Sequence, residues 1–89
     1  MAEVHFTSHL RSLVPDGPLA AVGGTVGEAL ASLIAAHPHV GGYVLDDQGR
    51  LRKHVCIFAD GERLKHDVAL GRPIGPQTKL YVMQALSGG

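Results

Sequence analysis

The sequence predicts an α+β domain in which one main helix packs on one face of a mixed sheet of four to five strands. Three observations predict it: apolar and polar residues alternate over residues 4–7, a one-faced apolar stripe follows at residues 25–37, and Asp60-Gly61 is a strong hairpin signal between two extended segments. Neither a one-faced helix nor a sheet can bury its apolar face alone, so the two must pack together.

The first two strands are expected on either side of a turn. Val4 and Phe6 alternate with polar neighbours, which is the period of a half-buried strand. Residues 8–18 end in a turn rich in Pro, Asp and Gly. Residues 19–22 form a short apolar run that can pair back on the first strand, and Gly23-Gly24 ends it.

The clearest helix signal begins at Thr25. Thr25 can cap the helix, and Glu28, three residues later, completes a capping box. Pro38 is expected to end this helix. The residues spaced to form one face are Val26, Ala29, Leu30, Leu33, Ile34 and His37.

The segment after the helix is expected to be irregular. Gly41-Gly42 and residues 46–49 are predicted as turns on either side of a short segment, 43–45.

Three more strands are expected after residue 53. Residues 54–59 form a strand, and residues 62–66 return as a short partner across the hairpin turn. An irregular connection leads to the last strand at residues 79–84. Strands before and after the helix should lie parallel, joined by a right-handed crossover. This arrangement is a β-grasp, with a domain of residues 1–84 and a flexible tail, 85–89, that ends in Gly-Gly.

The predicted sheet has one face that the helix does not cover. Strand alternation places Val4, Phe6, Val55, Ile57, Leu80 and Val82 toward the helix. The opposite face then holds His5, Cys56, Phe58, Lys79, Tyr81 and Met83. Phe58, Tyr81 and Met83 are large and apolar for a solvent face, and we predict a partner-binding surface there. The alternatives are a patch without a role and a register shifted by one residue.

Size and charge exclude several classes of function. With 89 residues the chain forms one small domain, on which a deep catalytic cleft is hard to build. Zero formal net charge argues against nucleic acid and anionic membranes as partners. Cys56 is the single cysteine, and no signal peptide or bilayer-length apolar run is visible. We therefore expect a cytosolic protein.

The last two residues, Gly88 and Gly89, suggest chemistry at the terminal carboxylate. Glycine lets a narrow channel close around the backbone, so the carboxylate can reach an active site on another protein. A carboxylate with a pKa of about 3.5 is a poor electrophile at neutral pH, so it must first be activated. ATP and Mg²⁺ on a partner enzyme can do this by adenylation. This chain has no phosphate-binding loop of its own. The alternative is a frayed terminus without a role.

The chain resembles the MoaD/ThiS family of ubiquitin-like sulfur carriers. The resemblance follows the order of elements over the whole chain and is strongest at residues 25–30, 54–61 and 81–89. The most specific part is the terminal Gly-Gly after an apolar strand.

The resemblance implies a carrier that is not itself an enzyme and binds no cofactor or metal. A ubiquitin-activating-enzyme-like adenylyltransferase would adenylate Gly89, and sulfur transfer would give a thiocarboxylate. A sulfur-accepting synthase would then use it for molybdopterin, the thiamine thiazole or a similar product, with this chain as carrier or small subunit. Gly88 and Gly89 form the reactive pair, and the expected partner contacts are Phe58, Tyr81, Met83, Leu86 and Ser87.

The branch of the family stays open, as do two other functions. Gln84-Ala85 stands where many molybdopterin-synthase small subunits have two prolines, and Gln84 is more similar to the thiamine carriers. The same tail would also serve a protein modifier joined to lysines through Gly89. A third possibility is a non-covalent interaction module that uses the Phe58 face.

Several other motifs are interpreted as structural. His37-Pro38-His39 lacks the Cys or carboxylate neighbours of a metal site. Cys56 has no evident base nearby and is predicted to pack on a half-buried strand. The basic run from Arg50 to His54 is predicted as a solvated loop that at most steers an acidic partner. A two-residue hairpin should pair His66 with Val55.

Overall fold

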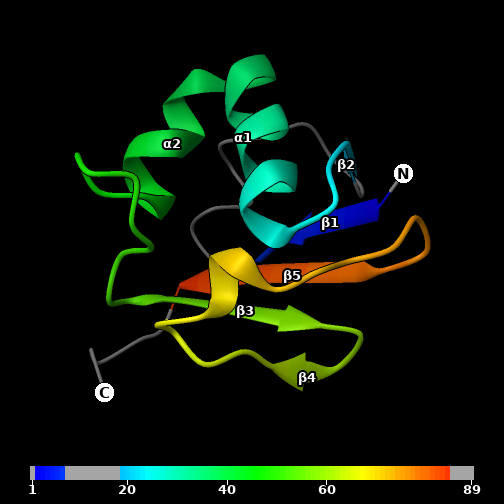
Figure 1. The fold of residues 1–89 in the computed structure, drawn as a ribbon. Coiled ribbons are helices and arrows are strands. Elements are labelled where there is room, and N and C mark those ends of the chain that lie inside the picture. The colour runs from blue at the N-terminus through cyan, green and yellow to red at the C-terminus, as the bar shows by residue number, and fades with distance from the viewer. Residues whose placement is uncertain (1, 8–18, 85–89) are drawn as a thin grey trace.

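The computed structural model describes residues 2–7 and 19–84 of the chain, and it has the predicted β-grasp architecture (Figure 1). The sheet has five strands in the order β2-β1-β5-β3-β4, with both helices on one face. The predicted parallel pairing occurs between β1 and β5 at the centre, and the other pairs are antiparallel. The elements are β1 (Ala2–Phe6), β2 (Leu19–Ala21), α1 (Val26–Ala36), α2 (Pro38–Val44), β3 (Val55–Ala59), β4 (Glu62–Arg63), the 3₁₀ helix η2 (Ala69–Gly71) and β5 (Lys79–Gln84).

Helix α1 begins as the capping pattern predicts, with one difference. The Thr25 hydroxyl accepts a hydrogen bond from the Glu28 backbone N–H at 3.2 Å. The Glu28 carboxylate accepts from the backbone N–H of Gly24 at 2.7 Å, one residue before the position that a capping box predicts. Gly23 allows the close approach, because a Cβ there would lie 2.5 Å from the Glu28 Cβ. The buried face of α1 is Val26, Ala29, Leu30 and Leu33.

The predicted turn at Gly41-Gly42 is wrong, because both residues lie inside the second helix, α2. Pro38 ends α1 as expected but also occupies the first turn of α2. Proline is tolerated there because backbone N–H groups in the first turn have no acceptor within the helix, so no hydrogen bond is lost. Gly41 suits the site because a Cβ there would lie 2.9 Å from the Ile34 side chain of α1. Close packing between the two helices therefore compensates for a residue that is unfavourable in helices.

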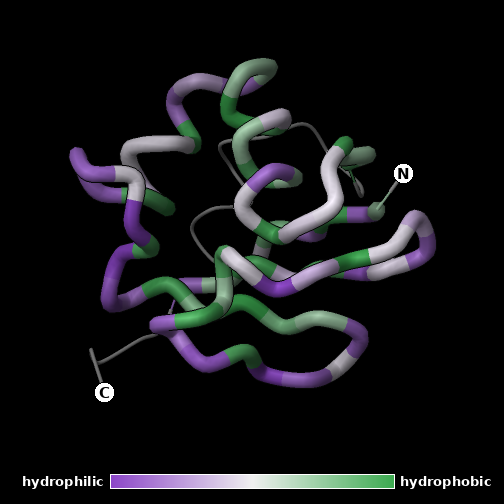
Figure 2. The backbone as a smooth tube through the Cα atoms, in the orientation of Figure 1, coloured by the Kyte–Doolittle hydropathy of each residue, from purple (hydrophilic) through white to green (hydrophobic). Residues whose placement is uncertain are grey.

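The predicted division of the sheet into two faces is confirmed. The inward set, Val4, Phe6, Val55, Ile57, Leu80 and Val82, is buried, and the members of the opposite set are half-buried or exposed. Val82 pairs with Phe6 of β1 on one side and with Ile57 of β3 on the other. Figure 2 shows the hydrophobic stretches of the strands and helices meeting in the interior. The core of the domain thus lies between α1, α2 and the three central strands.

The Asp60-Gly61 hairpin is confirmed. Both residues have positive φ, 49° and 88°, as a type I′ turn requires. The Asp60 carboxylate also accepts a hydrogen bond from the Lys79 backbone N–H at 3.0 Å, which ties the turn to the start of β5. The partner strand is shorter than predicted. β4 covers Glu62–Arg63, and Leu64 contributes one further bond from its N–H to the Ile57 carbonyl.

Replacement of Leu80 by alanine should destabilise the domain strongly. Leu80 is fully buried in β5, and removal of such a side chain typically costs about 2–5 kcal/mol. Met83→Ala in the same strand should cost clearly less, because Met83 is half-buried on the opposite face. Urea unfolding of both variants measures the difference. Equal losses of unfolding free energy would contradict the assignment of faces.

Candidate functional site

The reactive tail is expected to leave the domain from the centre of the sheet. Gly88, Gly89, Leu86 and Ser87 lie outside the described residues, as does the rest of the predicted 85–89 tail. The structure does place its point of departure: Gln84 ends β5 and pairs with Val55, the first residue of β3 (Figure 1). Five further residues can extend at most about 17 Å from there.

The side chains of Phe58, Tyr81 and Met83 lie together on the sheet face opposite the helices, where the sequence placed them. Phe58 and Tyr81 are direct cross-strand partners between β3 and β5. All three are half-buried. They form an apolar surface, the open face, that ends beside the tail's point of departure. The structure confirms this position, and the partner-binding role stays a prediction.

Two polar groups border the open face. The His5 ring stacks on Tyr81 with 4.5 Å between ring centroids, and its Nε2 lies 3.2 Å from the Glu3 carboxylate. Stacking of this kind holds the Tyr81 ring in place on the sheet. Cys56 is half-buried on the same face, and the Arg63 guanidinium donates to its sulfur at 3.5 Å.

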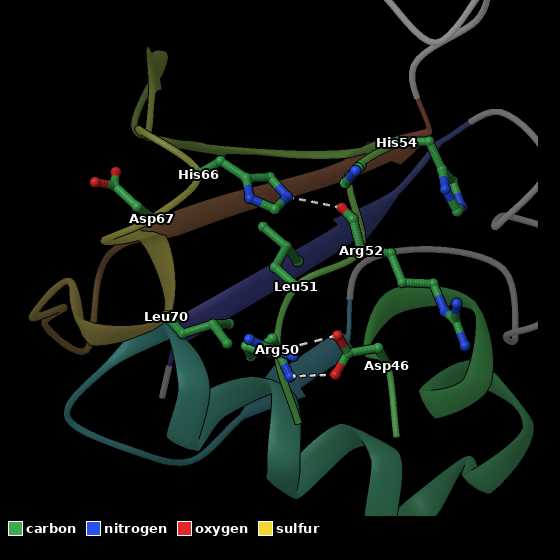
Figure 3. Close-up of a pocket in the computed structure, with 9 residues that line it drawn as sticks. Asp46, Arg50, Leu51, Arg52, His54, His66, Asp67 and Leu70 are labelled. Carbon is green, nitrogen blue, oxygen red and sulfur yellow. Dashed lines mark hydrogen bonds and ion pairs between the residues drawn. The ribbon is translucent and has the colours of Figure 1, made fainter. Parts of the chain in front are cut away.

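A polar cleft lies at the start of β3, between the loop before this strand and the chain after β4 (Figure 3). Figure 3 shows His66 pointing toward the loop before β3, where its Nε2 lies 2.8 Å from the Arg52 carbonyl. A carbonyl oxygen accepts only, so Nε2 carries the proton. The predicted pairing of His66 with Val55 is therefore wrong, because β4 ends at Arg63 and the chain turns away. The lining residues are Asp46, Arg50, Leu51, Arg52, Lys53, His54, His66, Asp67 and Leu70.

One of the two segments that line this cleft was predicted from the sequence, namely the basic run from Arg50 to His54. The contact of His66 with this run was not predicted. The Arg52 side chain is also fixed, because its Nε donates to the Gly42 carbonyl at the end of α2 at 2.8 Å. The sequence has a second group of basic residues at positions 63–66, whose last member, His66, lies on the other side of the cleft. The sequence alone did not place this group there, because its position depends on β4 ending early.

The loop that carries the basic run is organised by Asp46. One oxygen of its carboxylate accepts from the backbone N–H groups of Gln48 and Arg50, both at 2.9 Å. The Arg50 guanidinium lies 3.6 Å from the other oxygen. The hydrogen bond from the Arg50 backbone is the largest cause that lowers the pKa of Asp46 below its ordinary value of 3.8. Gly49, with φ at 77°, completes the predicted turn.

The remaining histidine motif forms part of a helix junction. His37 ends α1 and precedes α2, and its backbone N–H donates to the Leu33 carbonyl at 2.7 Å. Among residues 2–7 and 19–84, no three His, Cys, Asp or Glu side chains gather as a metal site would require. In the same residues, no helix has the length and apolar character needed to cross a bilayer.

A β-grasp sheet whose central strand runs toward a Gly-Gly tail defines the class of ubiquitin-like carrier and modifier proteins. No family model matches the chain. Small archaeal modifier protein 1 of Haloferax volcanii is 35% identical over 65 residues, which are 73% of this chain and 70% of that protein. The chain therefore belongs to the ubiquitin-like carriers and modifiers of the MoaD/ThiS type, the family of that relative. That relative is named as a small modifier protein and not as an enzyme.

Solved structures agree with this assignment. The crystal structure of SAMP1 from Haloferax volcanii matches with a TM-score of 0.79 and 27% identity, over 99% of this chain and 98% of that one. A chain of the Amycolatopsis orientalis BexX/CysO complex matches with a TM-score of 0.85 over the full length of both chains. Its identity is 18%, so that likeness shows the fold alone.

Replacement of Asp46 by asparagine should destabilise the domain at neutral pH and have less effect in acid. A carboxyl with a lowered pKa stabilises the folded state above its unfolded pKa, and that contribution is lost as the pH falls through its folded pKa. Asparagine keeps a single acceptor oxygen and no charge. Urea unfolding of both proteins at pH 7 and below pH 3.8 gives the comparison. An equal difference at both pH values would contradict this role of the ionised carboxylate.

Proposed function

We propose that this chain is a sulfur carrier whose Gly89 carboxylate is adenylated and then converted to a thiocarboxylate. The observation that carries the proposal is the pairing of Gln84 with Val55, since it fixes the point from which the tail leaves the central strand, one residue after Met83 of the open face. A partner that binds the open face would therefore hold the start of the tail close to its own active site. The family of the chain supports the same conclusion.

The chemistry requires two activating steps on partner enzymes. A Gly89 carboxylate oxygen attacks the α-phosphorus of ATP, with Mg²⁺ on the phosphates, and pyrophosphate leaves. A hydrosulfide equivalent then attacks the carbonyl carbon, the C–O bond to phosphate breaks, and AMP leaves with the electron pair. The product is a thiocarboxylate, which a synthase uses as its sulfur donor. This chain contributes the nucleophilic carboxylate, the Gly88-Gly89 pair, whose lack of Cβ atoms lets a narrow channel close around it, and the docking surface.

A second function has its own supporting observation. The 35% identical relative is named as a modifier protein. The adenylate that precedes a thiocarboxylate can also be attacked by a lysine amine, which would join Gly89 to another protein through an isopeptide bond. The two fates share the first step and differ in the nucleophile.

Deletion of Gly89 should abolish thiocarboxylate formation and leave the fold intact, because a terminal residue beyond the sheet adds little to the core. Intact mass spectrometry after incubation with the adenylyltransferase, ATP, Mg²⁺ and a sulfur donor provides the test. The full chain should gain the mass difference between sulfur and oxygen. Failure of the full chain to form either an adenylate or a thiocarboxylate would reject the carrier function.

Recovery of the affinity-tagged chain from cells separates carrier from modifier. A modifier gives covalent ladders on a denaturing gel that disappear when Gly89 is deleted. A carrier gives free chain with a thiocarboxylate. A biological activity that survives deletion of Gly89 would instead indicate a non-covalent interaction module.

Replacement of Tyr81 by alanine should weaken use of the chain by its activating enzyme. The change removes an aromatic side chain from the centre of the open face, where such residues commonly dominate binding energy. We expect the KM for the chain to rise by at least about tenfold, which corresponds to a loss of more than ~1.4 kcal/mol. Val68→Ala is the control, because Val68 is exposed in the turn before η2, away from this face. Equal KM values for both variants would exclude the open face as the docking surface.

A further inference from the structure

Two clefts on the outer edge of the sheet adjoin one another and share a basic lining. The first is the cleft before β3, and the second continues along β3 beyond the end of β4; both include Lys53, His66 and Asp67. Figure 2 shows hydrophilic stretches along both segments that supply this lining, the loop before β3 and the chain after β4. We call six basic residues of the two clefts the basic rim: Arg52, Lys53, His54, Arg63, Lys65 and His66. Arg50 also lines the first cleft but is engaged by Asp46.

Within the described part of the chain, the lysines of the basic rim have no carboxylate partner. Lys53 and Lys65 are exposed, and neither forms an ion pair with any carboxylate of the described residues. The acidic residues of the two clefts do not neutralise them: Asp46 is engaged by Arg50 and by backbone N–H groups, and Asp67 is a single exposed carboxylate. The clefts therefore carry a local excess of positive charge on a chain whose formal net charge is zero.

The position of the basic rim relates it to the tail. Lys53 and His54 directly precede Val55, which pairs with Gln84 at the end of β5. Any enzyme that holds Gly89 must place its surface within about 17 Å of Gln84, the reach of the last five residues. That distance brings its surface against the start of β3. This step rests on the proposed function, in which Gly89 is the reactive group.

We propose that the basic rim docks an acidic stretch of polypeptide on the enzyme that adenylates Gly89. The two clefts are lined by two exposed lysines and by Arg52 and Arg63, each of which donates one guanidinium N–H within the domain; cationic donors of this kind match carboxylate side chains. Opposite charges at an interface chiefly raise the rate of association and select the partner. The open face supplies apolar contact, and the basic rim sets the orientation in which the tail enters the partner. A nucleic acid fits this surface less well, because a neutral domain lacks the extended field that phosphate backbones require.

The test measures adenylation of the chain by the adenylyltransferase. ATP–pyrophosphate exchange reports the rate of this reaction. The variant Lys53→Glu/Lys65→Glu reverses the two unpaired charges. At low ionic strength we expect its KM to rise by about tenfold with kcat unchanged. The charge reversal slows association of the chain with the enzyme and leaves the adenylation step itself unchanged. The difference should shrink at 0.5 M salt, where charges are screened over a few ångströms. Lys53→Arg/Lys65→Arg is the matched control, because it changes the same two side chains and keeps both positive charges.

The outcomes separate this inference from the proposed function. If the unaltered chain supports no exchange, the proposed function fails and the inference fails with it. If it supports exchange but Lys53→Glu/Lys65→Glu and Lys53→Arg/Lys65→Arg have the same KM at low salt, the inference alone is wrong. Urea unfolding shows whether each variant is folded. Binding of a fluorescently labelled single-stranded RNA that depends on Lys53 and Lys65, without an effect on KM, would also overturn the inference and assign the rim to nucleic acid.

Discussion

The pairing of β5 between β1 and β3 is the constraint on which the rest of the structure depends. β5 comes last in the chain, yet it occupies the centre of the sheet, parallel to β1 and antiparallel to β3. Leu80 and Val82 are fully buried beneath the helices, so the register of β5 cannot slip by one residue without exposing them. The same register fixes Gln84 beside Val55 and thereby the place from which the tail leaves.

One alternation of side chains serves both stability and recognition. Toward the helices, β5 contributes to the core, and on the other face it presents Tyr81 and Met83. A partner can therefore dock on the side chains of the strand that continues into the tail. The basic rim adjoins the start of β3, and Val55, the first residue of that strand, pairs with Gln84. Such a geometry supports the proposed role of the terminus as a substrate of other enzymes.

Local signals predicted most elements correctly because the chemistry that causes them is local. The Thr25 cap, the Asp60-Gly61 turn and the alternation in β1, β3 and β5 each depend on a few neighbouring residues. Helix α2 was missed because Pro38 and Gly41-Gly42 are unfavourable within helices. The decisive factor was tertiary: Gly41 lies against Ile34 of α1, where a larger residue would not fit without a shift. The length of β4 was overestimated for a similar reason, since the chain leaves the sheet after Arg63 and His66 bonds to Arg52 instead.

The sequence by itself determined the fold class, the two faces of the sheet and the Gly88-Gly89 ending, because periodicity and composition encode them directly. The tertiary structure decided how surfaces far apart in the chain combine. It placed Gln84 beside Val55, and it joined the basic loop before β3 to Arg63, Lys65 and His66. Those relations arise from strand order and from contacts over long sequence separations, which no local pattern of residues specifies.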